Sequence, residues 1–246
     1  MDQRRQPTAV NNGNTNETTK TQRSGPMKFC IISAHFGGKK PWTNEIKSMH
    51  DCKFVYYDDN NMPGRENAMH PRLKSKIPKM LAWRYHKADW YIWMDSSVII
   101  KPGVDLAQCV LDTANGNPLC LFKHTKLNRI QDEVRLVKKA VRSNVEYFER
   151  RFKGEPILSQ VNHYLSDKEF IDNKLFQMTF FAYHYSAREM MQEWFMQNCL
   201  WSIKDQLSFP YVLQKSGLKY SLFKGDALQN NIFFWNIQKR DQTNQI

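Results

Sequence analysis

A carboxylate follows directly after a strongly apolar run in the segment Trp90-Tyr-Ile-Trp-Met-Asp-Ser-Ser97. The run Trp90–Met94 predicts a buried strand, because it is short, aromatic and almost without polar groups. Asp95 is then expected at the rim of the core, where a charge is costly unless it has a partner. A divalent cation or a sugar hydroxyl would provide one, and a helix N-cap or a turn is the alternative use of such an Asp-Ser-Ser segment.

Polar residues also follow two earlier predicted strands. The run Lys28–Ala34 leads into His35-Phe-Gly-Gly38, and Phe54–Tyr57 leads into Asp58-Asp-Asn60. Ligands of open α/β sheets bind beyond the carboxyl ends of the strands. These three strand ends are therefore the first candidates for a common binding site.

Basic residues precede the Asp95 strand. Arg72, Lys76 and Lys79 fall on one side of a predicted helix if that helix continues through Pro78, where proline requires either a helix start or a kink. Such a stripe could bind a diphosphate. The alternative interpretation is a solvated basic helix face.

Three further candidates lie later in the chain. Asp205 heads a predicted helix over 205–214, and either a ligand contact or a simple first-turn acid fits that place. His124 and Glu133 flank a basic segment, where a structural or surface role is the alternative to catalysis.

The sequence contains no HExxH, Walker A, GxSxG or full GxGxxG motif, which argues against the protease, P-loop, hydrolase and dinucleotide-binding classes.

Strands and helices alternate along the chain, which predicts an α/β fold with a mainly parallel central sheet flanked by helices. The expected strands are 28–34, 54–57, 90–94, 98–100, 119–122, 175–184 and 220–223. The expected helices are 43–49, 70–86, 104–113, 187–201 and 205–214, with 130–170 wholly helical.

Composition predicts one globular domain over residues 27–240, between a disordered tail over 1–26 and a short tail over 241–246. The 246 residues are 41% hydrophobic and carry a formal net charge of +12. That excess favours an anionic partner such as a nucleotide diphosphate, a nucleic acid or an acidic polysaccharide. The sequence predicts a cytoplasmic protein, in the host cytoplasm if the chain is viral. Its five cysteines are widely spaced, and it shows neither a secretory signal nor an apolar stretch long enough to span a bilayer.

In their shared order, these segments resemble the GT-A-type glycosyltransferases. The resemblance is closest to the putative hexosyltransferase group that includes plant TOD and mucilage-related proteins and has bacterial and viral members. It extends over residues 28 to 215. The segments that carry it are the strand ending in Phe36-Gly-Gly38, Phe54-Val-Tyr-Tyr-Asp-Asp-Asn60, the Arg72 to Lys79 stripe, Tyr91-Ile-Trp-Met-Asp-Ser-Ser97, Phe122-Lys-His124 with Arg129 and Glu133, and Asp205-Gln-Leu-Ser-Phe-Pro-Tyr-Val212.

The resemblance implies a single nucleotide-sugar-binding domain. It implies that Asp58 and Asp59 lie near the base or ribose, that Arg72 and Lys76 lie near the diphosphate, and that Asp95 takes the first place of a D-x-D site for Mg²⁺ or Mn²⁺. The full set of implied donor-binding residues is His35, Phe36, Gly37, Asp58, Asp59, Arg72, Lys76, Asp95 and Ser97. Ser97 stands where a second carboxylate is expected, so basic residues could neutralise the leaving group instead.

The implied catalytic residues are Asp205, Glu133 and His124. Asp205 or Glu133 would act as general base in an inverting reaction, and Asp205 would mainly orient the sugar in a retaining one. The expected activity is transfer of a sugar, with UDP-glucose as a candidate donor, to a hydroxyl of a modified base in viral DNA or of a polysaccharide. A non-catalytic nucleic-acid-binding protein is the competing hypothesis, favoured by charge alone.

Overall fold

The computed structural model describes residues 25–38, 40, 42–62 and 69–235. The predicted tails, 1–26 and 241–246, lie outside these residues except for 25 and 26. The domain boundaries therefore stay a prediction. None of the helices that the structure describes is long and apolar enough to cross a bilayer.

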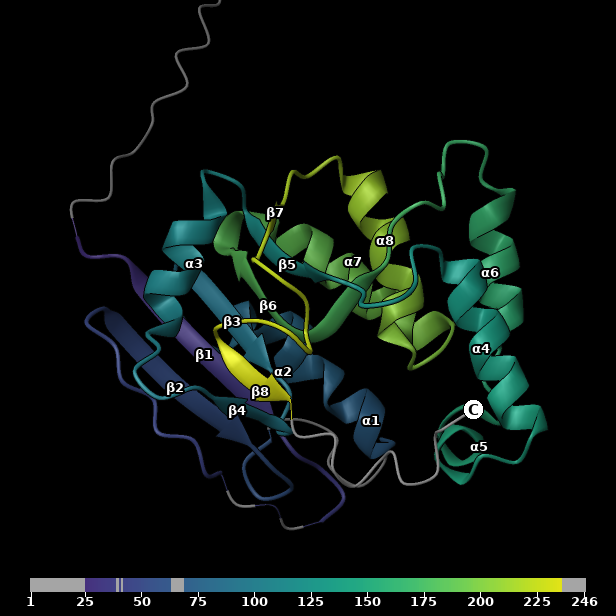
Figure 1. Ribbon diagram of the computed structural model, residues 1–246, viewed down its shortest axis with the longest axis horizontal. Helices are drawn as coiled ribbons and strands as arrows, with labels where there is room; N and C mark the ends of the chain where they lie inside the picture. The colour runs from purple at the N-terminus through teal and green to yellow at the C-terminus, as the bar shows by residue number, and fades with distance from the viewer. Residues whose placement is uncertain (1–24, 39, 41, 63–68, 236–246) are drawn as a thin grey trace, which may run out of the picture.

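Six strands form the central sheet, in the order β2-β1-β3-β6-β5-β7 (Figure 1). Their bounds are β1 Lys28–Ala34, β2 Asp51–Tyr57, β3 Trp90–Met94, β5 Leu119–Lys123, β6 Phe176–His184 and β7 Ser221–Leu222. Three of the five pairings are parallel, and β6 runs antiparallel to both of its neighbours. The predicted α/β class with a mainly parallel central sheet flanked by helices is confirmed.

The two faces of the sheet are buried in different cores, because side chains alternate along a strand. In β1, Cys30 and Ile32 join the core that includes helices α2, α7 and α8, whereas Phe29 and Ile31 join the core that includes α3. All five side chains of β3 are buried. A strand buried on both faces reads as a continuous apolar run, as in the sequence of Trp90–Met94.

Eight α-helices are described. Their bounds are α1 Pro71–Lys74, α2 Lys76–Leu81, α3 Leu106–Ala114, α4 Ile130–Arg142, α5 Glu146–Phe152, α6 Ile157–Ser166, α7 Arg188–Leu200 and α8 Asp205–Ser216. Short 3₁₀ turns follow α2 at Ala82–Arg84 and β6 at Tyr185–Ala187. Helices α4, α5 and α6 lie together at one end of the sheet (Figure 1) and pack on α8 around a third core.

The predicted helix over 43–49 is wrong. The segment has no regular structure, and its polar side chains bond to other parts of the chain instead of supporting a helical turn. The Asn44 side chain donates to the carbonyl of Val98 at 2.9 Å and accepts from the Ile100 backbone at 2.8 Å. Short polar side chains that bond backbone groups in this way compete with helix formation.

The uniform helix over 130–170 is also wrong, since the segment forms three helices, α4, α5 and α6. Asn144 and Gly154 interrupt it with positive φ angles of 53° and 85°. The strand expected over Val98–Ile100 is confirmed, although it lies outside the central sheet. It forms β4 and pairs with β8, Phe233–Trp235, in a separate two-stranded sheet, and β8 was not predicted.

Pro78 neither starts nor kinks a helix. The chain breaks at Ser75 between α1 and α2, and Pro78 takes the third position of α2. The first turn of a helix tolerates proline, because its N–H groups have no partner within the helix. Lys76 and Lys79 keep the spacing of neighbours on one helix face.

Trp194 of α7 lies in the core between the sheet and its helices, and a substitution there tests this packing. Its fully buried ring contacts Phe181 and Phe209, and its Nε1 donates to the Asp205 carbonyl at 3.0 Å. We expect Trp194→Ala to lower the free energy of unfolding by about 3–5 kcal/mol, through lost burial and a cavity. Urea denaturation measures this, with the exposed Met196→Ala on the same helix as control. Equal losses in the two variants would contradict the packing.

Candidate functional site

Several sequence-predicted residues lie at one edge of the central sheet. Strands β1, β2, β3 and β5 all run in the same direction, so His35, Asp58, Asp95 and His124 follow their carboxyl ends at a common edge. Strand β6 runs the opposite way and begins at that edge. Ligands of open α/β sheets bind at this position, and the candidate site is built there.

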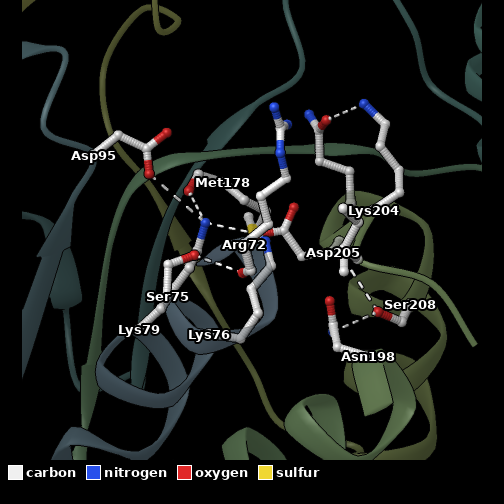
Figure 2. A network of polar contacts seen from close by, with 12 residues as sticks. Arg72, Ser75, Lys76, Lys79, Asp95, Met178, Asn198, Lys204, Asp205 and Ser208 are labelled. Carbon is white, nitrogen blue, oxygen red and sulfur yellow. Dashed lines mark hydrogen bonds and ion pairs between the residues drawn. The ribbon is translucent and has the colours of Figure 1, made fainter. Parts of the chain in front are cut away.

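Two lysines of α2 and one carboxylate of α8 form the centre of the site (Figure 2). Asp205 Oδ2 lies 2.6 Å from Lys76 Nζ and 2.8 Å from Lys79 Nζ. All three residues are buried. Lys79 Nζ also donates to the Met178 carbonyl of β6 at 2.7 Å, which fixes the ammonium group between the helix and the sheet.

The charges in this group set the protonation of Asp205. Burial alone would raise the pKa of Asp205, but the ammonium groups of Lys76 and Lys79 outweigh it and lower that pKa below its usual range. Burial lowers the pKa of Lys76, and the nearby Asp205 acts in the opposite direction. Asp205 is thus held as a carboxylate of low proton affinity, which does not favour the predicted role as general base.

Asp95 joins the cluster from the end of β3. Its Oδ1 accepts a hydrogen bond from Trp93 Nε1 at 2.9 Å and lies 3.9 Å from Lys79 Nζ. The side chain is 34% exposed, compared with 12% for Asp205. Asp95 is therefore the carboxylate of the cluster that a ligand reaches most easily. Arg72 belongs to the same polar network (Figure 2).

A metal at Asp95 was predicted from the resemblance. Among the described residues, no group of three histidine, cysteine or carboxylate side chains is arranged to hold a cation. The Lys79 ammonium lies 3.9 Å from Asp95 Oδ1, and the Ser97 hydroxyl accepts a hydrogen bond from Trp235 Nε1 at 3.2 Å. These side chains by themselves do not fit a complete cation site, and the metal stays a prediction.

The ends of β1 and β2 are tied together by a second ion pair. Asp59 accepts a hydrogen bond from the Gly37 N–H at 2.9 Å and lies 3.3 Å from the buried Lys74 Nζ. The Gly37 hydrogen bond is the main cause of the lowered pKa of Asp59, and Lys74 acts in the same direction. Lys74 Nζ also lies 4.9 Å from the centre of the Phe36 ring. These contacts fix the loops that were predicted to hold the base and ribose.

Asp58 and His35 have local contacts at the same edge. Asp58 Oδ1 accepts from the Asn60 N–H at 2.8 Å within its own turn. His35 Nδ1 lies 3.4 Å from the Ser96 hydroxyl, and burial lowers the pKa of His35. The structure therefore brings the β1 loop beside the loop after β3, as a shared ligand site requires.

His124 and Glu133 form a third group with Lys204. Glu133 pairs with Lys204 Nζ, and its second oxygen lies 3.9 Å from His124 Nε2. His124 Nδ1 accepts from the Leu127 N–H at 3.0 Å, so the neutral ring carries its proton on Nε2. Burial is the largest cause of the lowered pKa of His124. The group lies next to Asp205 along the chain, because Lys204 immediately precedes α8.

Three lysines of the site were not among the predicted site residues. Lys74 and Lys79 were recognised only as part of the basic segment from Arg72 to Lys79, and Lys204 was not singled out. Burial distinguishes them from surface lysines, since the exposed fractions of their side chains are 5%, 5% and 13%. A run of basic residues in a sequence carries no signal of which ammonium groups are buried.

The depressed pKa of Asp205 predicts a pH-dependent loss of stability. Its carboxylate stabilises the fold fully above the unfolded pKa of about 3.9, and that contribution is lost as the pH falls through the lower folded pKa. We expect the stability difference between wild type and Asp205→Asn to shrink below about pH 4. Urea unfolding between neutral pH and about pH 3 measures it, with the exposed Asp112→Asn as control. A difference that stays constant across this range would contradict the ion pairs.

Comparisons with known proteins add little to this geometry. No protein-family model matches the sequence, and no curated protein matches it. Among solved structures, the chain is similar to a crystal structure described as a glycosyltransferase involved in the glycosylation of the major capsid of PBCV-1. The identity is 10%, the match covers 82% of this chain and 83% of that chain, and the TM-score is 0.42. At that level the similarity does not decide the family or the activity, which must be argued from the site.

Proposed function

We propose that this protein is a nucleotide-sugar-dependent glycosyltransferase that transfers a hexose to a hydroxyl acceptor. The observation that carries the proposal is the buried group of Lys76, Lys79 and Asp205 with the accessible Asp95 beside it. The group lies at the carboxyl edge of a mainly parallel sheet, where nucleotides bind in α/β folds. Perturbed and charge-coupled residues at such a place are candidates for a functional site.

In this proposal the donor diphosphate binds beside Lys76, Lys79 and Arg72. Ammonium and guanidinium groups in a partly buried site stabilise the charge that develops on a leaving nucleotide. The two lysines already face the carboxylates of Asp205 and Asp95, so these four side chains carry no formal excess of positive charge. Additional positive charge for the diphosphate must come from Arg72 or from a cation that arrives with the donor.

We include Mg²⁺ or Mn²⁺ in the proposal on these grounds. Asp95 would provide one carboxylate oxygen, and the donor diphosphate would provide others, since Mg²⁺ is often bound through one or two carboxylates and substrate phosphates. The ion would supply Lewis-acid stabilisation of the leaving group. Donor binding should then depend on the metal, although the protein alone offers an incomplete ligand set.

The environment of Asp205 favours an orienting role. A carboxylate held by two ammonium groups is a poor proton acceptor, and its oxygens are positioned to orient a sugar or the lysines. Glu133 pairs with Lys204, and the neutral His124 can donate a hydrogen bond from Nε2. This arrangement suits a retaining reaction, which needs no strong base, better than an inverting one.

The acceptor in the proposal is a hydroxyl of a modified base in viral DNA or of a polysaccharide. UDP-glucose is the first donor to test. The competing proposal, a non-catalytic nucleic-acid-binding protein, accounts for the net charge of +12 but gives no role to the acids at the strand ends.

A thermal-shift screen of UDP-, GDP- and CDP-sugars, with and without Mg²⁺ or Mn²⁺, tests the proposal. A donor at one hundred times its Kd should stabilise the native state by about 2.7 kcal/mol, which is roughly 5–10 °C in Tm for a chain of this size. The shift should be larger with the metal present. If no sugar nucleotide raises Tm or is hydrolysed under either condition, the proposal is wrong.

Asp95→Asn separates donor binding from general stability. We expect this variant to keep its unliganded Tm within about 2 °C, because the side chain is partly exposed, and to lose most of the donor-induced shift. Asp112→Asn, on the exposed side of α3, should behave as wild type. A full donor shift in Asp95→Asn would remove Asp95 from the site.

A further inference from the structure

Half of the net positive charge lies in one short region of the chain. Residues 123–153 contain ten lysines and arginines against four acids, a formal net charge of +6, compared with +12 for all 246 residues. This region comprises the loop after β5 and helices α4 and α5, which form one end of the molecule with α6 (Figure 1). Half of the formal net charge of the chain is therefore carried by this end of the molecule.

Helix α4 presents four of these cations on a single face, which we call the α4 stripe. It consists of Arg135, Lys138, Lys139 and Arg142, spaced at i, i+3, i+4 and i+7. Three of the four are exposed and Lys138 is half-buried, whereas Ile130, Val134 and Val137 bury the opposite face. The stripe extends about 10 Å along the helix axis, at 1.5 Å per residue.

The α4 stripe is largely unneutralised. Arg135 pairs with Asp132, with a distance of 3.0 Å from Nη1 to Oδ1. Within the described part of the chain, no carboxylate lies within ion-pair distance of Lys138, Lys139 or Arg142. Their charges face solvent and remain available to an anionic partner.

A hollow adjoins the end of the stripe, between α4, the end of α5 and the start of α6. Lys138 and Arg142 belong to both the stripe and the hollow, and Lys153, which pairs with Glu149 at 2.6 Å, also lines the hollow. The remaining lining is mostly apolar and includes Val141, Phe152, Ile157 and Leu158. Glu155 also lines the hollow, and its carboxylate accepts a hydrogen bond from the Ile203 N–H at 3.1 Å.

We propose that the α4 stripe and the adjoining hollow bind a single-stranded nucleic acid, with phosphates on the stripe and a base in the hollow. Single strands are bound by a cationic groove that follows the phosphates, with side chains against which the bases stack. In this hollow, Leu158 is an exposed apolar side chain and the Phe152 ring is buried in the lining. A duplex keeps its bases stacked, so the apolar lining would stay unused. An acidic polysaccharide also needs hydrogen-bond partners for its hydroxyls. Apart from its cations, the lining offers Ser159 and Glu155 for this purpose. The mostly apolar lining therefore suits a base better than a sugar.

Fluorescence anisotropy with a labelled thymidine oligonucleotide tests the proposal on the full chain. The stripe variant changes all four stripe residues to glutamine: Arg135→Gln, Lys138→Gln, Lys139→Gln and Arg142→Gln. It should bind the oligonucleotide at least tenfold more weakly than wild type at low salt. The slope of log K against log salt should fall by up to about 3, at about 0.7 per lost phosphate contact. An abasic strand with the same phosphates should bind several-fold more weakly to wild type, because the hollow would have no base to accept.

The matched control removes the same charge elsewhere, at Lys53, Lys87, Lys219 and Lys224, all changed to glutamine. These lysines are exposed and lie outside residues 123–153. The control should lose no more than about threefold in affinity, and circular dichroism and Tm should show both variants folded. If a stripe variant fails to fold, the single variant Lys139→Gln, at an exposed position, gives the same test with a smaller expected loss of two- to threefold.

Four outcomes would overturn the proposal. One is equal weakening by the stripe variant and the control, which would mean a response to total charge. Another is preference for duplex DNA or for heparin over the single strand. The third is equal binding of the abasic strand, which would exclude the hollow, and the fourth is no binding at low salt. None of these binding measurements depends on glycosyl transfer. A negative result would therefore exclude the nucleic-acid-binding surface without excluding the proposed activity, and the reverse also holds.

Discussion

The buried ammonium group of Lys79 is the contact on which the carboxyl edge of the sheet depends. It reaches the Met178 carbonyl, the Asp205 carboxylate and, at 3.9 Å, Asp95. The rings of Trp93, Phe181 and Trp194 lie 5.4–6.0 Å away, which leaves little room for water. A buried charge costs several kcal/mol unless its partners are in place. Helix α2, strands β3 and β6 and helix α8 must therefore be assembled together for this charge to be tolerated.

The same cluster holds two carboxylates beside two lysines. Asp205 pairs with both ammonium groups, and Asp95 adds a solvent-accessible carboxylate 3.9 Å from Lys79 Nζ. Asp95 is farther from Lys79 than Asp205 is and retains an accessible side chain. The cluster thus has a buried part, made by Lys76, Lys79 and Asp205, and an accessible part at Asp95. A site that binds a charged substrate benefits from such a division, because the buried part keeps its geometry while the accessible carboxylate meets the ligand.

The sequence predicted the structure best where the residue types of a short segment determine its burial. The apolar run Trp90–Met94 predicted both the buried strand and the position of Asp95 at its end. It was least informative where contacts distant in sequence decide. The helix expected over 43–49 is replaced by bonds from Asn44 to β4, and these partners lie more than fifty residues away. The break of α1 and α2 at Ser75 and the burial of Lys74 and Lys204 depend equally on tertiary packing, which local composition does not encode.

Helix α4 lies between the candidate site and the basic surface, and its two faces carry different charges. On its inner face Glu133 pairs with Lys204, beside the candidate site, whereas its outer face carries the α4 stripe. Like charges at i, i+3 and i, i+4 destabilise a helix by about 0.2–0.5 kcal/mol per pair, and the stripe contains four such pairs. The pair of Arg135 with Asp132 and the favourable position of cations near a helix C-terminus offset part of this cost. Salt screens part of the remainder, and an anionic partner on the stripe would relieve it further.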